Sequence, residues 1–137
     1  MKKWISLVIV LIFIFTMTTA CQEKHKPKYE DGTFDAESEY DDNGWKGSID
    51  IEVKDGKITK VNYNELNKDG EKKSEDDDYS ASMEESSGIS PKEAYGQLEK
   101  SLIEAQDPDE LEAVSGATGS SGVFKDLANH ALKIKNK

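Results

Sequence analysis

The sequence has few of the side chains that catalytic and metal sites most often use. It contains one cysteine, Cys21, and two histidines, His25 and His130. A single cysteine excludes an intramolecular disulfide. The two histidines are far apart, one in a polar N-terminal stretch and one off the apolar stripe of the last predicted helix, so we expect neither a Ser-His-acid triad nor a multi-histidine metal site. The sequence therefore predicts no metal site and no catalytic residue, and we interpret the protein as a non-enzyme.

Positive charge is scarce as well. The 137 residues include 18 basic and 28 acidic side chains, which gives a net charge of −10. Loss of residues 1–20 removes two lysines and no acids, and brings the charge to about −12. A chain of this charge is repelled by phosphate backbones, so we expect no nucleic acid partner.

The N-terminus has the pattern of an export signal. Two lysines precede the apolar run 4–15, which only Ser6 interrupts and which is too short for a membrane span. Residues 18–21 resemble a lipobox that ends at Cys21. We predict that residues 1–20 are a signal peptide and that Cys21 is the lipidated N-terminus of the mature protein; an uncleaved anchor with an incidental cysteine is the alternative. Both place the protein on the extracytoplasmic face of a bacterial cell membrane.

Polar residues 21–29 are predicted to be the lipidated cysteine and a flexible tether, and residues 30–137 a single domain. About 100 residues suffice for one modest hydrophobic core. Apolar and polar residues alternate over 33–40, 46–53 and 57–65, which predicts three strands. Asp55-Gly56 predicts a tight hairpin turn, and the imperfect alternation that follows predicts a bulge near Thr59 or Lys60.

Helical patterns follow the strands. A short helix is expected over 79–85 with Gly88 at its end, and a longer one after the N-cap Ser90, ending at 107–108. The last helix is predicted to begin at Ser120 or Ser121. We therefore expect an α+β fold, an antiparallel β-sheet with packed helices. The acidic run 75–78 lacks the spacing of an EF-hand loop and is interpreted as a solvated face.

The loop before the last helix is the candidate binding site. Residues 115–122 read Ser-Gly-Ala-Thr-Gly-Ser-Ser-Gly. Glycines there permit backbone conformations closed to other residues, and amides at a helix N-terminus can converge on an anion. The glycine spacing does not match a P-loop, and no dinucleotide fingerprint or nucleophile elbow is present. A flexible serine-capped loop without a ligand is the alternative.

This loop resembles the flavinylation motif of the FMN-binding domain family, Asp-x-x-Ser/Thr-Gly-Ala-Thr-Ser/Thr, whose final Gly-Ala-Thr threonine carries FMN through a phosphoester. Glu112 stands in place of the usual Asp, and Gly119 in place of the second Ser/Thr. The resemblance runs from about Tyr29 to Leu132 and implies covalent FMN at Thr118. The cofactor-binding residues that it implies are Ser115, Gly116, Ala117, Thr118, Ser120 and Ser121. Trp45 resembles an aromatic of the family's second strand, and we expect it to pack in the core rather than against a flavin.

The resemblance implies an electron carrier in extracellular or membrane-associated electron transfer. Its expected partners are an FAD:protein FMN transferase, a membrane dehydrogenase or quinone-linked donor, an extracellular acceptor, and the membrane through the lipid anchor. Acids near the loop, namely Glu110, Glu112 and Asp126, are expected to lower the flavin potential. Two alternatives remain: a module that binds FMN or another ligand reversibly, and a non-redox surface lipoprotein whose leader yields a signalling peptide.

Overall fold

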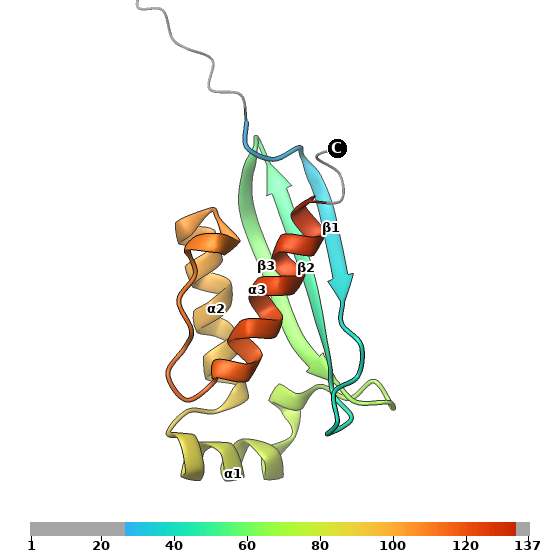
Figure 1. Ribbon diagram of the computed structural model, residues 1–137, viewed down its shortest axis with the longest axis vertical. Coiled ribbons are helices and arrows are strands. Elements are labelled where there is room, and N and C mark those ends of the chain that lie inside the picture. The colour runs from blue at the N-terminus through green and yellow to red at the C-terminus, as the bar shows by residue number, and fades with distance from the viewer. Residues whose placement is uncertain (1–26, 134–137) are drawn as a thin grey trace, which may run out of the picture.

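Three antiparallel strands form the sheet, in the order β1-β2-β3. They are β1 (Gly32–Glu37), β2 (Lys46–Lys54) and β3 (Lys57–Leu66). The structure, a computed structural model, describes residues 27–133 (Figure 1). The predicted signal peptide and Cys21 lie outside the described residues. The α+β prediction is confirmed, because helices cover this sheet.

The β2–β3 hairpin forms as its sequence predicts. Asp55 and Gly56 both have positive φ, 53° and 74°, as a type I′ turn requires. Val53 pairs with Ile58 but Glu52 pairs with Lys60, so Thr59 is the extra residue of a β-bulge. The predicted turn and bulge are therefore confirmed.

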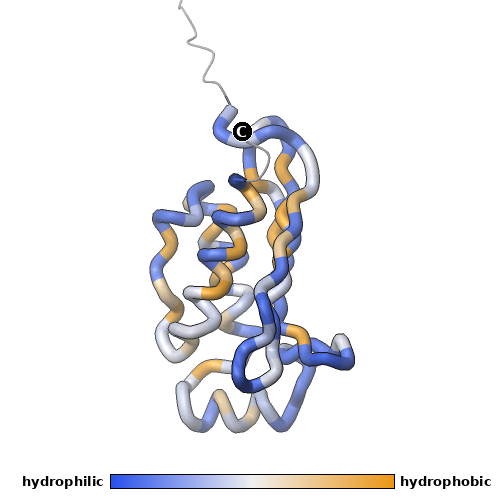
Figure 2. Tube along the Cα trace, turned by 45° about the vertical axis from the view of Figure 1, so that its right-hand side comes forward, coloured by the Kyte–Doolittle hydropathy of each residue, from blue (hydrophilic) through white to orange (hydrophobic). Residues whose placement is uncertain are grey.

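One face of the sheet is buried beneath α2 (Pro91–Ala105) and α3 (Thr118–Lys133). The hydrophobic segments concentrate where these helices face the strands (Figure 2). The fully buried side chains there include Ile49, Ile51, Ile58, Leu98, Leu102 and Phe124. Polar residues alternate with them along the strands and form the exposed face, so the hydrophobic pattern fixes the register of the sheet.

A close approach brings α3 against β2. A Cβ at Gly47 would lie 2.6 Å from Val123 Cγ1 and 2.9 Å from Leu127 Cδ1. Only glycine leaves room for the first turns of α3 at this point. This contact positions the N-terminal end of α3 near the end of the sheet where β2 begins.

The helix α1 (Asp77–Ser87) has no buried residue, and lies across the end of the domain opposite the β2–β3 turn (Figure 1). Asp76 caps its start and Gly88, in a left-handed conformation, ends it. Ser90 then caps α2, because its hydroxyl accepts a hydrogen bond from the Glu93 amide at 3.3 Å. The helix predicted over 79–85 is thus longer by a few residues at both ends. Two 3₁₀ turns, η1 (Lys73–Glu75) and η2 (Pro108–Glu110), complete the fold.

The last helix begins earlier than predicted. α3 starts at Thr118, not at Ser120 or Ser121. Ser121 does not cap it, because its amide donates to the Ala117 carbonyl in the ordinary helical pattern at 2.9 Å. The serines suggested a cap by composition, but the turn formed by the preceding glycine moves the helix start to Thr118.

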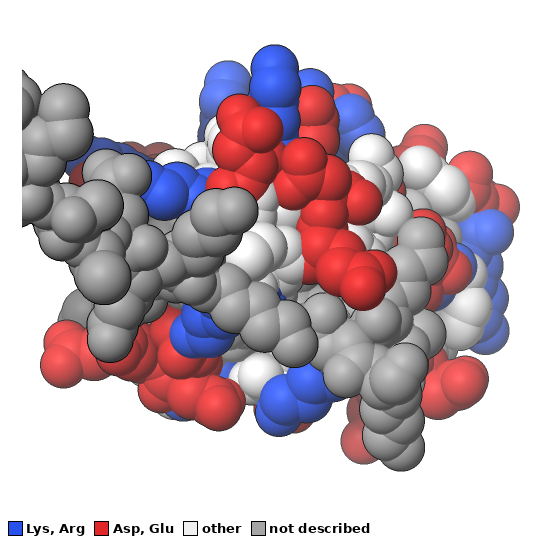
Figure 3. All heavy atoms as spheres, turned by 90° about the horizontal axis from the view of Figure 1, so that it is seen from above, with Lys and Arg blue, Asp and Glu red and all other residues white. Residues whose placement is uncertain are grey.

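The start of the described chain is packed against the domain. Tyr29, which the sequence assigns to the tether, is buried, and its hydroxyl donates to the Gln106 carbonyl at 3.0 Å. Lys28 forms an ion pair with Asp107. The Tyr29 ring packs in the hydrophobic core. The polar composition of the predicted tether did not indicate this contact. Viewed from this end, carboxylates and lysines lie interspersed (Figure 3).

Within residues 27–133, no helix has the length and apolar character needed to cross a membrane. The same residues contain no cluster of three or more acidic, histidine or cysteine side chains arranged for a metal ion.

Candidate functional site

The loop before α3 is held by hydrogen bonds within itself. The Ala117 amide donates to the Val114 carbonyl at 3.0 Å. The Ser121 hydroxyl accepts from the Val114 amide at 2.9 Å and donates to the Ala117 carbonyl at 2.7 Å. Gly116 has a φ of 84°, in the left-handed region. These bonds turn the chain sharply and present Thr118 as the first residue of α3.

Thr118 and its two neighbours leave backbone donors available. No acceptor within residues 27–133 receives the amides of Thr118, Gly119 or Ser120. Such amides at the positive end of a helix dipole form an anion site. The Thr118 side chain is itself exposed. The loop therefore offers an accessible hydroxyl beside several donors suited to a phosphate.

This loop forms one wall of a cavity of about 670 Å³. The residues that follow β1, the start of β2, the end of β3 with η1, and α1 provide the other walls. The lining residues include Trp45, Glu65, Lys73, Tyr79, Met83 and Thr118. Small-molecule sites measure roughly 300–1,000 Å³, so this cavity is of the size that binds a nucleotide-sized cofactor.

Trp45 lines the cavity instead of packing in the core, contrary to the sequence-based expectation. Asp41 fixes the turn before it, because one carboxylate oxygen accepts from the amides of Asn43 and Trp45, each at 2.9 Å. The indole meets Tyr79 of α1 edge-on, with ring centroids 5.9 Å apart. The prediction that Trp45 packs in the core was wrong, because the turn that carries it lies beyond the part of the sheet that α2 and α3 cover.

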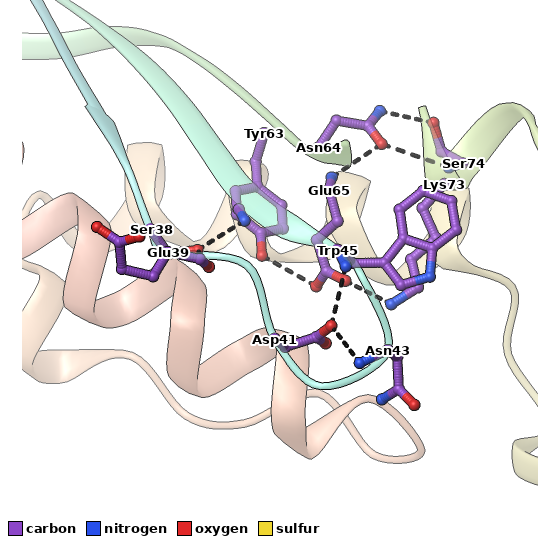
Figure 4. A network of polar contacts seen from close by, with 11 residues as sticks. Ser38, Glu39, Asp41, Asn43, Trp45, Tyr63, Asn64, Glu65, Lys73 and Ser74 are labelled. Atoms are coloured by element: carbon purple, nitrogen blue, oxygen red, sulfur yellow. Dashed lines mark hydrogen bonds and ion pairs between the residues drawn. The ribbon is translucent and has the colours of Figure 1, made fainter. Parts of the chain in front are cut away.

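A buried ion pair lies beside Trp45 (Figure 4). Lys73 Nζ donates to Glu65 Oε2 at 2.5 Å, and the Tyr63 hydroxyl donates to Glu65 Oε1 at 3.1 Å. Glu65 and Lys73 are only 5% and 7% exposed. Burial disfavours the Lys73 ammonium, but hydrogen bonding and attraction to Glu65 outweigh it and raise the pKa of Lys73. The lysine thus stays charged at neutral pH.

The ammonium also faces two aromatic rings. Lys73 Nζ lies 5.2 Å from the centroid of Trp45 and 4.6 Å from that of Tyr79. Contacts of this kind stabilise a partly desolvated cation. Burial, with the nearby Glu65 charge, raises the pKa of Tyr63, so its hydroxyl remains a donor to Glu65.

The structure brings part of the sequence-predicted site together. Gly116, Ala117, Thr118 and Ser120 line the cavity, whereas Ser115 and Ser121 do not. Ser121 is buried and holds the loop from behind. The three acids expected to act on the flavin, Glu110, Glu112 and Asp126, are exposed and are not among the lining residues.

Other cavity residues escaped the sequence reasoning. Glu39, Asp41 and Glu65 are the acids that line the cavity, and Lys73 and Tyr79 join them. One signal was present for Glu65: it continues the buried positions of β3 and is thus an acid on the apolar face of a strand. Lys73 carried none, because it lies in a run of exposed charged residues.

These residues fit FMN. A phosphate matches the amides at the start of α3, which find no acceptor in the described part of the chain. The Trp45 and Tyr79 rings suit a flat aromatic ring system. The cavity volume suffices for both parts of the cofactor. Thr118 is the hydroxyl of the motif that faces this space.

Comparisons with known proteins agree with this geometry. The sequence model of the FMN-binding domain family matches residues 44–133. The protein therefore belongs to the FMN-binding domain family. It is 38% identical over 103 residues to a 15 kDa lipoprotein of Treponema pallidum (strain Nichols), a match that covers 74% of this chain and 73% of that protein.

Two solved structures share the fold. The crystal structure of a protein from Clostridium perfringens has a TM-score of 0.74 at 45% identity, covering 77% of this chain and 87% of that one. The solution NMR structure of a protein from Clostridium thermocellum has a TM-score of 0.54 at 33% identity, covering 79% and 93%. Both likenesses support the α+β fold.

Proposed function

We propose that this protein is a membrane-anchored flavoprotein that carries electrons outside the cell membrane through FMN covalently bound at Thr118. The observation that carries the proposal is the position of Thr118, whose exposed side chain lines the cavity at the first turn of α3. It lies beside three amides that have no acceptor among residues 27–133. The bound flavin supplies reversible one- or two-electron chemistry. The protein's part is to hold the cofactor, orient it and set its potential.

Attachment requires a partner enzyme. An FAD:protein FMN transferase would form the bond between Thr118 Oγ1 and the FMN phosphorus, break the diphosphate bond of FAD and release AMP, with the hydroxyl proton leaving to a base. The exposure of Thr118 supports access by such an enzyme. A covalent bond suits an exported protein, since it has no access to the cytoplasmic flavin pool from which to reload.

The proposed location is the outer face of the cell membrane. The similar Treponema pallidum protein is named a lipoprotein, and the sequence of this chain has a lone cysteine directly after an apolar leader. A lipid at Cys21 would raise the effective concentration of the domain near a membrane dehydrogenase or a quinone-linked donor. An extracellular acceptor would then receive the electrons.

Mass spectrometry tests the attachment. Mature protein co-expressed with the transferase should gain the mass of one FMN, and Thr118→Val should gain none while keeping its fold. Thr118→Ser keeps a hydroxyl and should be modified at least in part. An FMN mass retained in Thr118→Val would overturn the assignment of Thr118.

Denaturing electrophoresis distinguishes the two modes of binding. Covalent flavin stays fluorescent on the protein band, whereas reversibly bound FMN is lost. The substitutions in the motif, Glu112 and Gly119, make reversible FMN binding the second candidate. A flavin absorption spectrum that disappears on denaturation would select it, and the absence of any bound flavin would select the non-redox lipoprotein.

A further inference from the structure

Lys73 is the one basic side chain among the described residues that line the cavity. Three carboxylates, Glu39, Asp41 and Glu65, line the same space. A reduced flavin that bears negative charge would face a predominantly acidic cavity without this lysine. Among the described lining residues, Lys73 is therefore the source of positive side-chain charge where an anionic ring would be bound.

The position of Lys73 is fixed from several sides. Glu65 holds its ammonium at 2.5 Å, and the rings of Trp45 and Tyr79 lie beside it. Its backbone is fixed too, because the Asn64 side chain donates to the Ser74 hydroxyl at 2.6 Å and accepts from the Ser74 amide at 3.3 Å. A charge held in this way acts on its surroundings without reorganising.

A structural role alone does not explain the pair. Removing two charges from water carries a large desolvation cost, and apolar side chains of similar volume often stabilise a fold as well or better. The Glu65–Lys73 pair also borders a cavity with aromatic walls, where a fixed cation can act on a bound ring. These two observations point to a function in cofactor chemistry.

We propose that Lys73 is the cation that stabilises the anionic reduced form of FMN in this cavity, with Glu65 as the residue that positions it. This inference rests on the proposed FMN binding. Two electrons from the donor and one proton from solvent convert the oxidised ring to the anionic reduced form, and a second proton gives the neutral one. A neighbouring ammonium favours the anionic reduced flavin over the neutral one, and it raises the midpoint redox potential of the flavin.

Phosphate binding is the competing role for a lone lysine. The amides of Thr118, Gly119 and Ser120 already serve an anion at the start of α3, whereas Lys73 lies between the two rings that suit the flavin. The two roles differ in what they predict for riboflavin, which has the ring and lacks the phosphate.

The test measures the second protonation of the reduced flavin. Flavin-loaded protein is reduced with dithionite without oxygen and titrated with acid while its absorption is recorded. In Lys73→Met the pKa of that proton should rise by about one unit, as expected on loss of an opposite charge within about 4–6 Å. Lys72→Met is the matched control: Lys72 is exposed, pairs with Glu75 at 3.2 Å and does not line this cavity, so the pKa should not change.

Glu65→Gln gives an independent test with the opposite sign. Glutamine keeps an acceptor for Lys73 but removes the negative charge, so the pKa of the reduced flavin should fall. A general disturbance of the cavity would move both variants in the same direction, and that result would overturn the proposal. Lys73→Met leaves Glu65 buried and unpaired and could fail to fold. In that case Glu65→Gln alone tests the proposal through the sign of its effect on the pKa of the reduced flavin.

Two further outcomes separate the hypotheses. An unchanged pKa in a flavin-loaded Lys73→Met protein would overturn the role of Lys73 while leaving the proposed function intact. Apoprotein of the same variant that binds FMN more weakly but riboflavin normally would assign Lys73 to the phosphate and also overturn it. Wild-type protein that binds no flavin at all would instead refute the proposed function on which the inference rests.

Discussion

The carbonyl oxygen of Ser87 lies where a side chain on Gly116 would project. A Cβ at Gly116 would stand 2.5 Å from that oxygen and 3.0 Å from Ile89 Cγ2. The motif loop thus packs directly against the C-terminal end of α1, a helix that forms another wall of the same cavity. Because Gly116 also has a φ of 84°, both its conformation and its contact require glycine.

Gly116→Ala should therefore destabilise the domain by roughly 2–3 kcal/mol, from left-handed strain together with the clash. Flavin loading should fall as well, since the loop must shift away from α1. Urea unfolding followed by circular dichroism measures the first effect. Gly119→Ala is the matched control for stability: beyond its chain neighbours and the backbone of its own helix, no heavy atom lies within 4 Å of its Cβ position. Alanine there should be neutral or stabilising by about 0.5–1 kcal/mol within the helix. Equal stability of the two variants would contradict this account.

Substitutions at Glu112 test whether the transferase recognises the carboxylate at this position of the motif. Its side chain is exposed and does not line the cavity, so a role in flavinylation would come through the partner enzyme. Glu112→Asp should hold or increase the modified fraction, and Glu112→Ala should lower it, as measured by intact mass after limited co-expression. Stability should change by less than about 0.5 kcal/mol in both. Equal modification of all three proteins would show that this position has no part in transfer.

The proposed lipid anchoring depends on Cys21, which lies outside the described part of the chain. Cys21→Ala removes the thiol that lipidation requires, so the protein should appear in the medium or remain an unprocessed precursor. Cell fractionation with immunoblotting measures this, and flavin loading of the released domain should be unchanged. Retention of a correctly cleaved Cys21→Ala form in the membrane would contradict the lipoprotein proposal.

Local rules predicted the parts of this fold that local chemistry determines. The Asp55-Gly56 turn, the bulge at Thr59 and the Ser90 cap each depend on a few neighbouring residues, and each is confirmed. The motif loop, which the sequence analysis predicted as a binding site, lies on one wall of a cavity. Local structure that depends only on a few neighbouring residues can therefore be predicted from the sequence.

The remaining features depend on contacts between distant segments. Trp45 is an aromatic residue next to a strand, which favours a core position. The turn that the Asp41 carboxylate stabilises instead places its side chain at the cavity. Lys73 gave no signal, because its burial depends on Glu65 eight residues earlier and on rings from two other elements. Acids close to Thr118 in sequence lie elsewhere, whereas Glu39 approaches only through the fold.

The buried phenols predict loss of stability at alkaline pH. Burial, with the Glu65 charge, raises the pKa of Tyr63 and of Tyr95. The native state then keeps protons that the unfolded chain releases above about pH 10, so the stability they contribute is full below that pH and is lost as pH rises further. Lys73, whose pKa is also raised, acts in the same direction. Each such group lowers the free energy of unfolding by about 1.4 kcal/mol per pH unit above its unfolded pKa.

Tyr63→Phe should separate this effect from ordinary packing. At pH 7 it should cost about 1 kcal/mol through loss of the hydrogen bond to Glu65. Between pH 10 and 11 its free energy of unfolding should fall less steeply than that of the wild type, as measured by urea unfolding. Tyr40→Phe serves as the control, since Tyr40 is 42% exposed. The same slope in Tyr63→Phe and wild type would refute the assignment.

Trp45 provides a direct reporter of flavin binding. The chain has two tryptophans, and the other, Trp4, lies in the predicted signal peptide, so the emission of the mature domain comes from Trp45. FMN added to apoprotein should quench this emission, because flavins absorb where tryptophan emits and the indole lines the cavity. Trp45→Ala should weaken FMN binding about 5- to 150-fold by calorimetry, the range of roughly 1–3 kcal/mol for loss of an aromatic stacking partner. Tyr40→Ala, which removes an exposed aromatic outside the cavity, should bind as the wild type does. Unchanged affinity in Trp45→Ala would mean that the indole closes the cavity wall without contacting the ring, and the quenching would then reflect proximity alone.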